Sequence, residues 1–248
     1  MIVAASTSCI PNTPLSDILD RLADLEYTNT ELVIGEQGSI TPSELVSQYD
    51  SIVHTCRISR RITPVALYFD LESTNPKYFE FFNIACQLSK SIKVVVMTVR
   101  ASVLGTPFNE EVERLRLLTQ IAMKCGVVLG LLTETGRLTE SPDTVGSLCK
   151  SVKGLGVTLD PSHYIYGQSK MKDYDGILGN VCHVRLRDTT PQHFQIRVGQ
   201  GVLEFGRLVI QLGKVDYRRS LCVDIAPLPD LDTAAELRKM RLLLESLL

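Results

Sequence analysis

The stretch KVVVMTVRASVLGTPFNEEVERLRLLTQIAMKCGVVLGLLTET, residues 93–135, contains two apolar runs separated by one helical pattern. The runs at 93–99 and 127–135 are nearly continuous and rich in valine and leucine, which is typical of strands buried on both faces of a parallel sheet. Between them, apolar residues recur at helical spacing, and Gly126 follows where a helix C-cap is expected. The stretch therefore predicts a strand, a helix and a second, parallel strand.

The same pattern repeats along the whole chain. Eight apolar runs lie at 2–6, 31–36, 64–71, 93–99, 127–135, 155–160, 181–188 and 220–225. They begin roughly 30 residues apart with helical patterns between them, which predicts eight βα units closed into one (β/α)8 TIM barrel. The rival fold, an open doubly wound sheet, usually has a glycine-rich first turn, and STSCIPNTP after the first run lacks the GxGxxG pattern.

Composition indicates one α/β domain spanning residues 1–248, with no linker or low-complexity segment. The chain has 26 Lys+Arg against 28 Asp+Glu, so its net charge of −2 gives no general attraction to nucleic acid. Its seven cysteines form no CxxC pair and lie mostly in apolar contexts, which favours reduced, buried thiols in the cytosol. The first residues lack the basic region of a signal peptide, and no stretch reaches the ~20 apolar residues of a membrane span. We expect a cytoplasmic protein with no membrane or nucleic-acid partner.

Polar groups follow or occupy four consecutive strands at the end where such barrels carry their chemistry. These are Glu134 at the end of the fifth run, Asp160 in TLDPSHY, His183 in CHVRLRD and Asp224 in LCVDI. Three carboxylates and an imidazole that meet at one point repel one another unless a cation joins them. This oxygen-rich set with one nitrogen predicts a divalent ion, Mn²⁺, Mg²⁺ or Co²⁺, with Zn²⁺ as a further option.

Side-chain alternation along the seventh strand adds two charged groups and leaves structural alternatives open. If His183 points into the barrel, Arg185 and Arg187 do so as well. Asp160, which precedes a proline, could simply cap a turn. His183 could be a hydrogen-bonded core histidine, and Asp224 could pair with an inward arginine such as Arg185.

The motifs TLDPSHY, HVRLRD followed by VGQG, and YRRSLCVDI resemble the xylose isomerase-like TIM barrels, the sugar phosphate isomerase and epimerase superfamily that includes endonuclease IV. The resemblance covers most of the chain. The family pattern implies that Glu134, Asp160, His183 and Asp224 bind the metal, and that His163 contacts the substrate. It also implies a small-molecule carbohydrate substrate and a homodimer or homotetramer.

The activity implied is that of a metal-dependent isomerase or epimerase of a sugar, sugar phosphate or related polyol. The ion would chelate a carbonyl and a neighbouring hydroxyl and stabilise an enediolate. Glu134 would take the carbon-bound proton, and Asp224 would return one. The candidate substrate-binding residues are His163, Arg185, Arg187, Arg197, Gly199 and Gly201.

The chain departs from the family pattern at two places. Asp224 stands where a glutamate is usual, and Thr135 and Gly136 stand where Asn and His often follow the glutamate of the fifth strand. The alternatives are a dehydratase on the same fold or a binding barrel without catalysis. Hydrolysis of DNA like that of endonuclease IV is disfavoured, because the chain has four histidines and an acidic balance.

Overall fold

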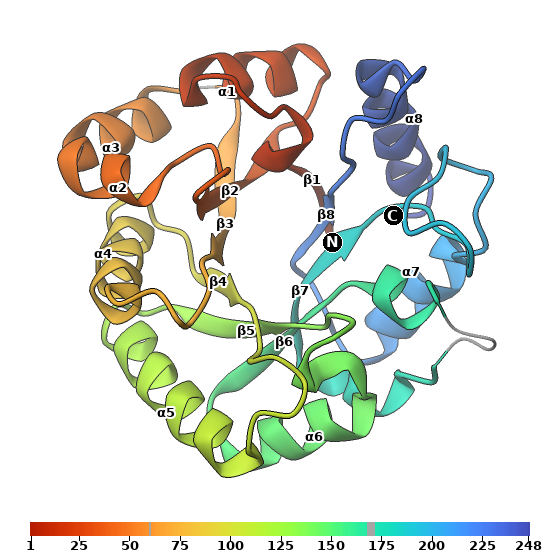
Figure 1. Cartoon of the computed structure of the whole chain (residues 1–248). Helices are drawn as coiled ribbons and strands as arrows, with labels where there is room; N and C mark the ends of the chain where they lie inside the picture. The colour runs from red at the N-terminus through yellow and green to blue at the C-terminus, as the bar shows by residue number, and fades with distance from the viewer. Residues whose placement is uncertain (60, 168–171) are drawn as a thin grey trace.

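Eight parallel strands close into a barrel in which each strand pairs with the next along the chain and β8 pairs with β1 (Figure 1). The computed structural model describes residues 1–59, 61–167 and 172–248. The strands are β1 Ile2–Ser6, β2 Asn29–Gly35, β3 Thr63–Asp70, β4 Val96–Val99, β5 Val128–Leu132, β6 Leu155–Leu159, β7 Val181–Leu186 and β8 Ser220–Val223. The predicted (β/α)8 barrel is confirmed.

Helices surround the barrel as a ring (Figure 1). They are α1 Leu15–Asp24, α2 Pro42–Ser47, α3 Tyr49–Ile58, α4 Tyr78–Ser91, α5 Phe108–Lys124, α6 Pro142–Ser151, α7 Phe205–Lys214 and α8 Thr233–Glu245. The prediction of one helix after every strand holds only in part. Two helices, α2 and α3, share the β2–β3 connection. The described residues between β6 and β7 form only the short 3-10 turns η3 Pro161–Tyr164 and η4 Asp175–Asn180.

Local signals explain where several helices start and stop. Thr41 caps α2 in a reciprocal arrangement with Glu44, so two backbone N–H groups at the helix start are hydrogen-bonded. The Asp232 carboxylate caps α8 by accepting hydrogen bonds from the backbone N–H groups of Ala234 and Ala235 in its first turn. After α5, Gly126 adopts a φ of 74°, a left-handed conformation that only glycine takes without strain.

The large apolar core lies between the strands and the helices, while the inside of the barrel is mostly polar. On β7, Val184 and Leu186 face outward into this core. A small second cluster of Val33, Tyr68 and Leu132 fills part of the barrel interior. Interiors of such barrels are usually packed with branched aliphatic residues, so the polar filling of this one marks the region where function is expected.

Two further sequence predictions can be compared with the structure. All seven cysteines are free thiols, and five of them are buried, as expected for packing residues. Among the residues that the structure describes, no helix combines the length and the apolar content that crossing a membrane requires.

Candidate active site at the barrel mouth

Strand β7 presents His183, Arg185 and, just beyond its end, Arg187 on its inward face, as alternation predicted. All three are at least nine-tenths buried, with exposed fractions of 0%, 4% and 9%. Two guanidinium groups inside a barrel cannot lose their charge, so each needs carboxylate partners. Those partners come from strands on both sides of β7.

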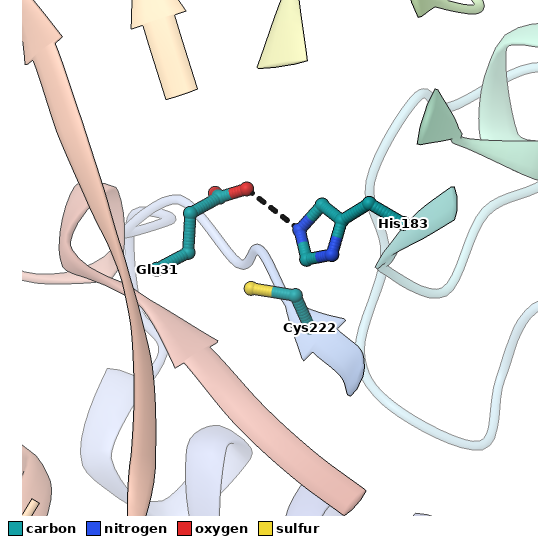
Figure 2. A group of neighbouring side chains, drawn as sticks. All are labelled: Glu31, His183 and Cys222. Carbon is teal, nitrogen blue, oxygen red and sulfur yellow. Dashed lines mark hydrogen bonds and ion pairs between the residues drawn. The ribbon is translucent and has the colours of Figure 1, made fainter. Parts of the chain in front are cut away.

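The deepest layer of this polar interior is formed by Glu31, His183 and Cys222 (Figure 2). Nε2 of His183 lies 2.8 Å from Oε2 of Glu31, and Nδ1 lies 3.2 Å from the Ser220 hydroxyl, so both ring nitrogens are hydrogen-bonded. One potential ligand atom from each of the three side chains lies within 4.8 Å of the other two. Within the described part of the chain, this is the group of His, Cys, Asp and Glu side chains close enough together to hold a metal ion.

Burial and nearby charges control the protonation of Glu31 and Cys222 in this inner trio. Burial raises the pKa of the Cys222 thiol well above its ordinary value. Burial alone would also raise the pKa of Glu31, but Arg185 and then the hydrogen bond from His183 hold it below its usual value. Because all three side chains are fully buried, an ion held here would be structural and out of reach of a substrate. Sequence reasoning missed Glu31 and Cys222.

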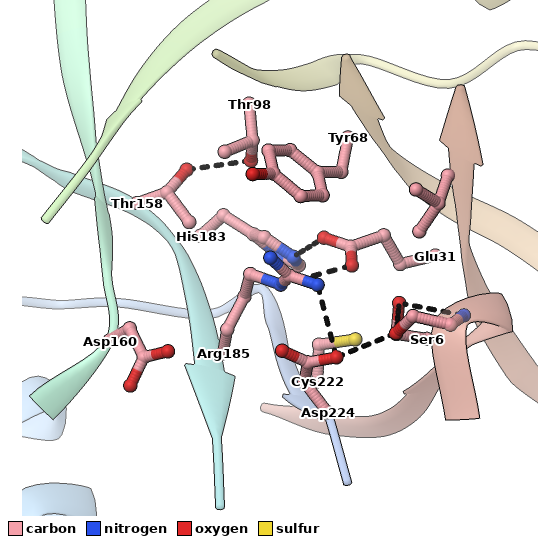
Figure 3. A network of polar contacts seen from close by, with 12 residues as sticks. Ser6, Glu31, Tyr68, Thr98, Thr158, Asp160, His183, Arg185, Cys222 and Asp224 are labelled. Carbon is pink, nitrogen blue, oxygen red and sulfur yellow. Dashed lines mark hydrogen bonds and ion pairs between the residues drawn. The ribbon is translucent and has the colours of Figure 1, made fainter. Parts of the chain in front are cut away.

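Arg185 forms the middle layer and lies between Glu31 and Asp224 (Figure 3). Its Nε is 3.2 Å from Oε1 of Glu31, and its Nη2 is 3.1 Å from Oδ1 of Asp224. The guanidinium also stacks on the Tyr68 ring, 4.3 Å from the ring centroid. The pairing of Asp224 with Arg185, one of the structural alternatives open from sequence, is therefore observed.

Arg187 forms the upper layer and joins two of the predicted metal ligands. Its Nη2 lies 3.1 Å from Oδ2 of Asp160 and also pairs with Oδ2 of Asp224. The Ser8 hydroxyl donates to the other Asp224 oxygen at 2.6 Å. Burial alone would raise the pKa of Asp224, but Arg185 and Arg187 hold it well below its usual value. Asp224 is thus an ionised and fully partnered carboxylate.

Asp160 and His163 follow β6, where the sequence placed them. Oδ1 of Asp160 accepts the Ser162 N–H at 3.0 Å and caps the 3-10 turn η3, so the capping alternative is also observed. Nε2 of His163 lies 3.9 Å from Oδ2 of Asp160, and its Nδ1 accepts the Thr135 N–H at 3.2 Å. Burial lowers the pKa of His163, although Asp160 acts in the opposite direction. The favoured form is a neutral ring with its proton on Nε2.

Glu134 follows β5 and is held by two arginines that sequence reasoning missed. Arg100, just after β4, donates Nε to Oε2 of Glu134 at 3.0 Å and pairs with the other oxygen as well. Nε of Arg137 lies 3.1 Å from the same Oε2. The carboxylate is 13% exposed, so it stands at the edge of the open C-terminal end of the barrel, which we call the mouth.

The VGQG segment folds around a further acid, Asp188, at the end of the HVRLRD motif. Oδ2 of Asp188 accepts the backbone N–H groups of Gly199 at 2.7 Å and Gly201 at 3.0 Å. A Cβ on Gly201 would come within 1.8 Å of Oδ1 of Asp188, so only glycine fits there. A substrate phosphate would have to displace Asp188 to reach these amides. The other loop candidate, Arg197, is exposed.

A divalent ion does not fit among Glu134, Asp160, His183 and Asp224 as they are arranged here. Both Asp224 oxygens and one Asp160 oxygen contact guanidinium groups, and the two nitrogens of His183 are used one layer below. A dication about 4 Å from a guanidinium is repelled by roughly 8 kcal/mol at an effective dielectric constant of about 20. The positive charge expected of an ion is already supplied by arginines.

A family model described as xylose isomerase-like TIM barrel matches residues 19–243. No curated protein sequence matches the chain. The sequence-based resemblance is confirmed by the family model.

Solved structures with the same fold cover nearly the whole chain at low identity. A D-tagatose 3-epimerase-like protein is 13% identical, with 99% of this chain and 97% of that chain covered and a TM-score of 0.77. A probable 3-DHS dehydratase from Bacillus anthracis is 13% identical, with 99% of both chains covered and a TM-score of 0.76. The IolI protein with a zinc atom is 16% identical, with 100% and 99% covered and a TM-score of 0.75. Identity at this level shows a shared fold.

Proposed function

The chain belongs to the xylose isomerase-like TIM barrel family, and we propose that it is an isomerase or epimerase of a sugar, a sugar phosphate or a related polyol. The observation that carries the proposal is the convergence of two proton donors on one point of the mouth. Nε2 of His163 and Nη2 of Arg187 approach the same atom, Oδ2 of Asp160, at 3.9 and 3.1 Å. A substrate oxygen that replaced this carboxylate oxygen would meet both donors.

Such donors are what the proposed chemistry needs. Removing a proton from the carbon beside a carbonyl moves the C–H electron pair into an enediolate, and negative charge develops on oxygen. Preorganised donors in a water-poor site stabilise that charge strongly. The neutral His163 ring, with its proton on Nε2, and the fixed cation of Arg187 both suit this role.

Glu134 and Asp224 remain the proposed proton carriers, one taking the carbon-bound proton and the other returning one. Each is paired with two arginines, and for Asp224 the two guanidinium groups hold the pKa of the carboxyl well below its usual value. Substrate oxygens that compete for the same guanidinium N–H groups would release the carboxylate next to the reacting carbon. An anionic end of the substrate would meet the exposed Arg197 in the loop after β7.

Proton exchange in D₂O tests the proposal directly. The protein is incubated in D₂O with a panel of ketoses, ketose phosphates and related polyols that carry a ketone. ¹H NMR follows the loss of the signal of the proton on the carbon beside the carbonyl. We expect exchange with at least one compound. His163→Ala should slow it by about 10²- to 10³-fold, the usual cost of removing an oxyanion donor. The matched control His54→Ala removes an exposed histidine of α3 and should exchange at the wild-type rate.

A binding barrel without catalysis is the second candidate, favoured by the double arginine pairing of both Glu134 and Asp224. Thermal stabilisation by a panel compound without any proton exchange would support it and would end the isomerase proposal. A dehydratase would instead show a new alkene resonance in the same spectra.

A further inference from the structure

Arg185 and Arg187 of β7 occupy the position among the carboxylates where a bound cation would lie. Arg185 and Arg187 stand two residues apart on one inward face, and three buried carboxylates surround them: Glu31, Asp160 and Asp224. Figure 3 shows the Arg185 guanidinium between Glu31 and Asp224, facing the interior of the barrel. Two permanent positive charges thus occupy the centre of the ring of acids.

Arg187 keeps a donor group that no protein oxygen uses. Nε of Arg187 is buried and lacks a hydrogen-bond partner within the described residues, whereas Nε of Arg185 faces Oε1 of Glu31 at 3.2 Å. All contacts of Arg187 with carboxylates run through Nη2. A buried donor without an acceptor is costly, so Nε of Arg187 is positioned for an oxygen that the protein itself does not supply.

Phe194 contacts both of the proposed proton donors, Arg187 and His163. The Arg187 guanidinium lies 4.5 Å from the centroid of the Phe194 ring, and the His163 ring lies 4.7 Å from it. One aromatic side chain of the long loop after β7 therefore holds both donors in place. Such stacking suits the planar guanidinium of arginine better than a lysine ammonium.

We infer that Arg187, supported by Arg185, takes the place of a divalent ion as the electrophile of this barrel. The inference rests on the proposed function and deepens it. Two N–H groups of one guanidinium can bind two neighbouring oxygens in parallel, so Arg187 would bind the carbonyl and the adjacent hydroxyl of the substrate. The carbon-bound proton leaves to a carboxylate, the electron pair moves to the carbonyl oxygen, and Arg187 keeps its own protons throughout.

Metal binding can be measured without any substrate. Wild-type protein is stripped with EDTA, titrated with Mn²⁺ while electron paramagnetic resonance follows the free ion, and then passed through gel filtration for elemental analysis. We expect retained Mn²⁺ far below one equivalent per chain. Stoichiometric Mn²⁺ that persists in Cys222→Ala would lie outside the inner trio and would overturn the inference. Binding that Cys222→Ala abolishes would place the ion in the core and leave the inference standing.

Removal of the cation should create the missing ion site. In Arg187→Met, Asp160 and Asp224 lose a shared positive partner, and Mn²⁺ should bind on the order of 100-fold more tightly than to wild type, because like-charge repulsion is gone. Arg197→Met removes an exposed arginine of the following loop and should bind Mn²⁺ like wild type. Arg187→Lys, which keeps the charge, should stay without Mn²⁺ and covers the case in which Arg187→Met does not fold.

The metal titration and the exchange assay test the role of Arg187 and the isomerase proposal separately. If no compound exchanges a proton but Mn²⁺ behaves as expected, the isomerase proposal falls and the arginine site remains a ligand-binding site without an ion. If exchange is seen and requires added Mn²⁺, the function stands and the role of Arg187 is refuted.

Discussion

Asp224→Asn removes the carboxylate that both buried arginines share. Oδ1 of Asp224 lies 3.1 Å from Arg185, and Oδ2 pairs with Arg187. Breaking a buried ion pair from one side costs about 3–5 kcal/mol. Because Arg185 keeps Glu31 and Arg187 keeps Asp160, we expect the lower end, about 3 kcal/mol of unfolding free energy at neutral pH.

The pH dependence of this loss gives a second test. Arg185 and Arg187 hold the pKa of Asp224 below its unfolded value. Its contribution to stability is therefore complete above that unfolded value, about pH 4, and is lost as the pH falls through the lower folded pKa. Asparagine does not titrate. The stability difference between wild type and variant should be largest near neutral pH and should shrink in acid.

Urea unfolding followed by circular dichroism measures both quantities. The matched control is Asp216→Asn, which removes an exposed carboxylate paired with Arg218 at 2.8 Å, with 83% of the Asp216 side chain exposed. Such surface pairs contribute less than about 1 kcal/mol. Equal stabilities of the two variants at neutral pH, or a difference that grows in acid, would refute the account of Asp224 as a buried, ionised partner of two arginines.

Two further changes probe other parts of the site. Gly201→Ala would bring a Cβ within 1.8 Å of Asp188 and should lower the free energy of unfolding by about 1–3 kcal/mol. The control Gly176→Ala places its Cβ with no atom within 4 Å and should leave the stability nearly unchanged. Equal melting temperatures of the two variants would contradict the packing of the VGQG segment. Glu31→Gln keeps the shape of the inner trio but removes the charge beside His183, and should lower the unfolding free energy by about 2–3 kcal/mol; an unchanged melting temperature would show that the pair contributes nothing.

The fold followed from the sequence because buried parallel strands leave a strong and local pattern. The run at 155–160 became β6, Leu155–Leu159, and the run at 2–6 became β1, Ile2–Ser6. Strand ends were less exact where an apolar run extended past the ladder. The run at 127–135 predicted a strand as far as Thr135, but β5 ends at Leu132. The backbone N–H groups of Glu134 and Thr135 donate to the side chains of Thr139 and His163 instead of to a neighbouring strand.

The site was only partly predictable, because alternation fixes the direction of a side chain but not its partner. The inward direction of Arg185 and Arg187 followed from His183 by counting residues along one strand. The acid that pairs with His183 lies on β2, 152 residues earlier in the chain. No spacing in the sequence joins the two. A charged residue at the start of the buried run ELVIGE was the available signal, since a buried carboxylate requires a partner.

The most direct test of the arginine-centred mouth is an X-ray structure from crystals grown with millimolar Mn²⁺, measured for its anomalous signal. The account predicts Arg187 between Asp160 and Asp224, Arg185 between Glu31 and Asp224, and no anomalous peak at the mouth. A manganese peak bonded to Glu134, Asp160 and Asp224, with the arginines turned away, would contradict it.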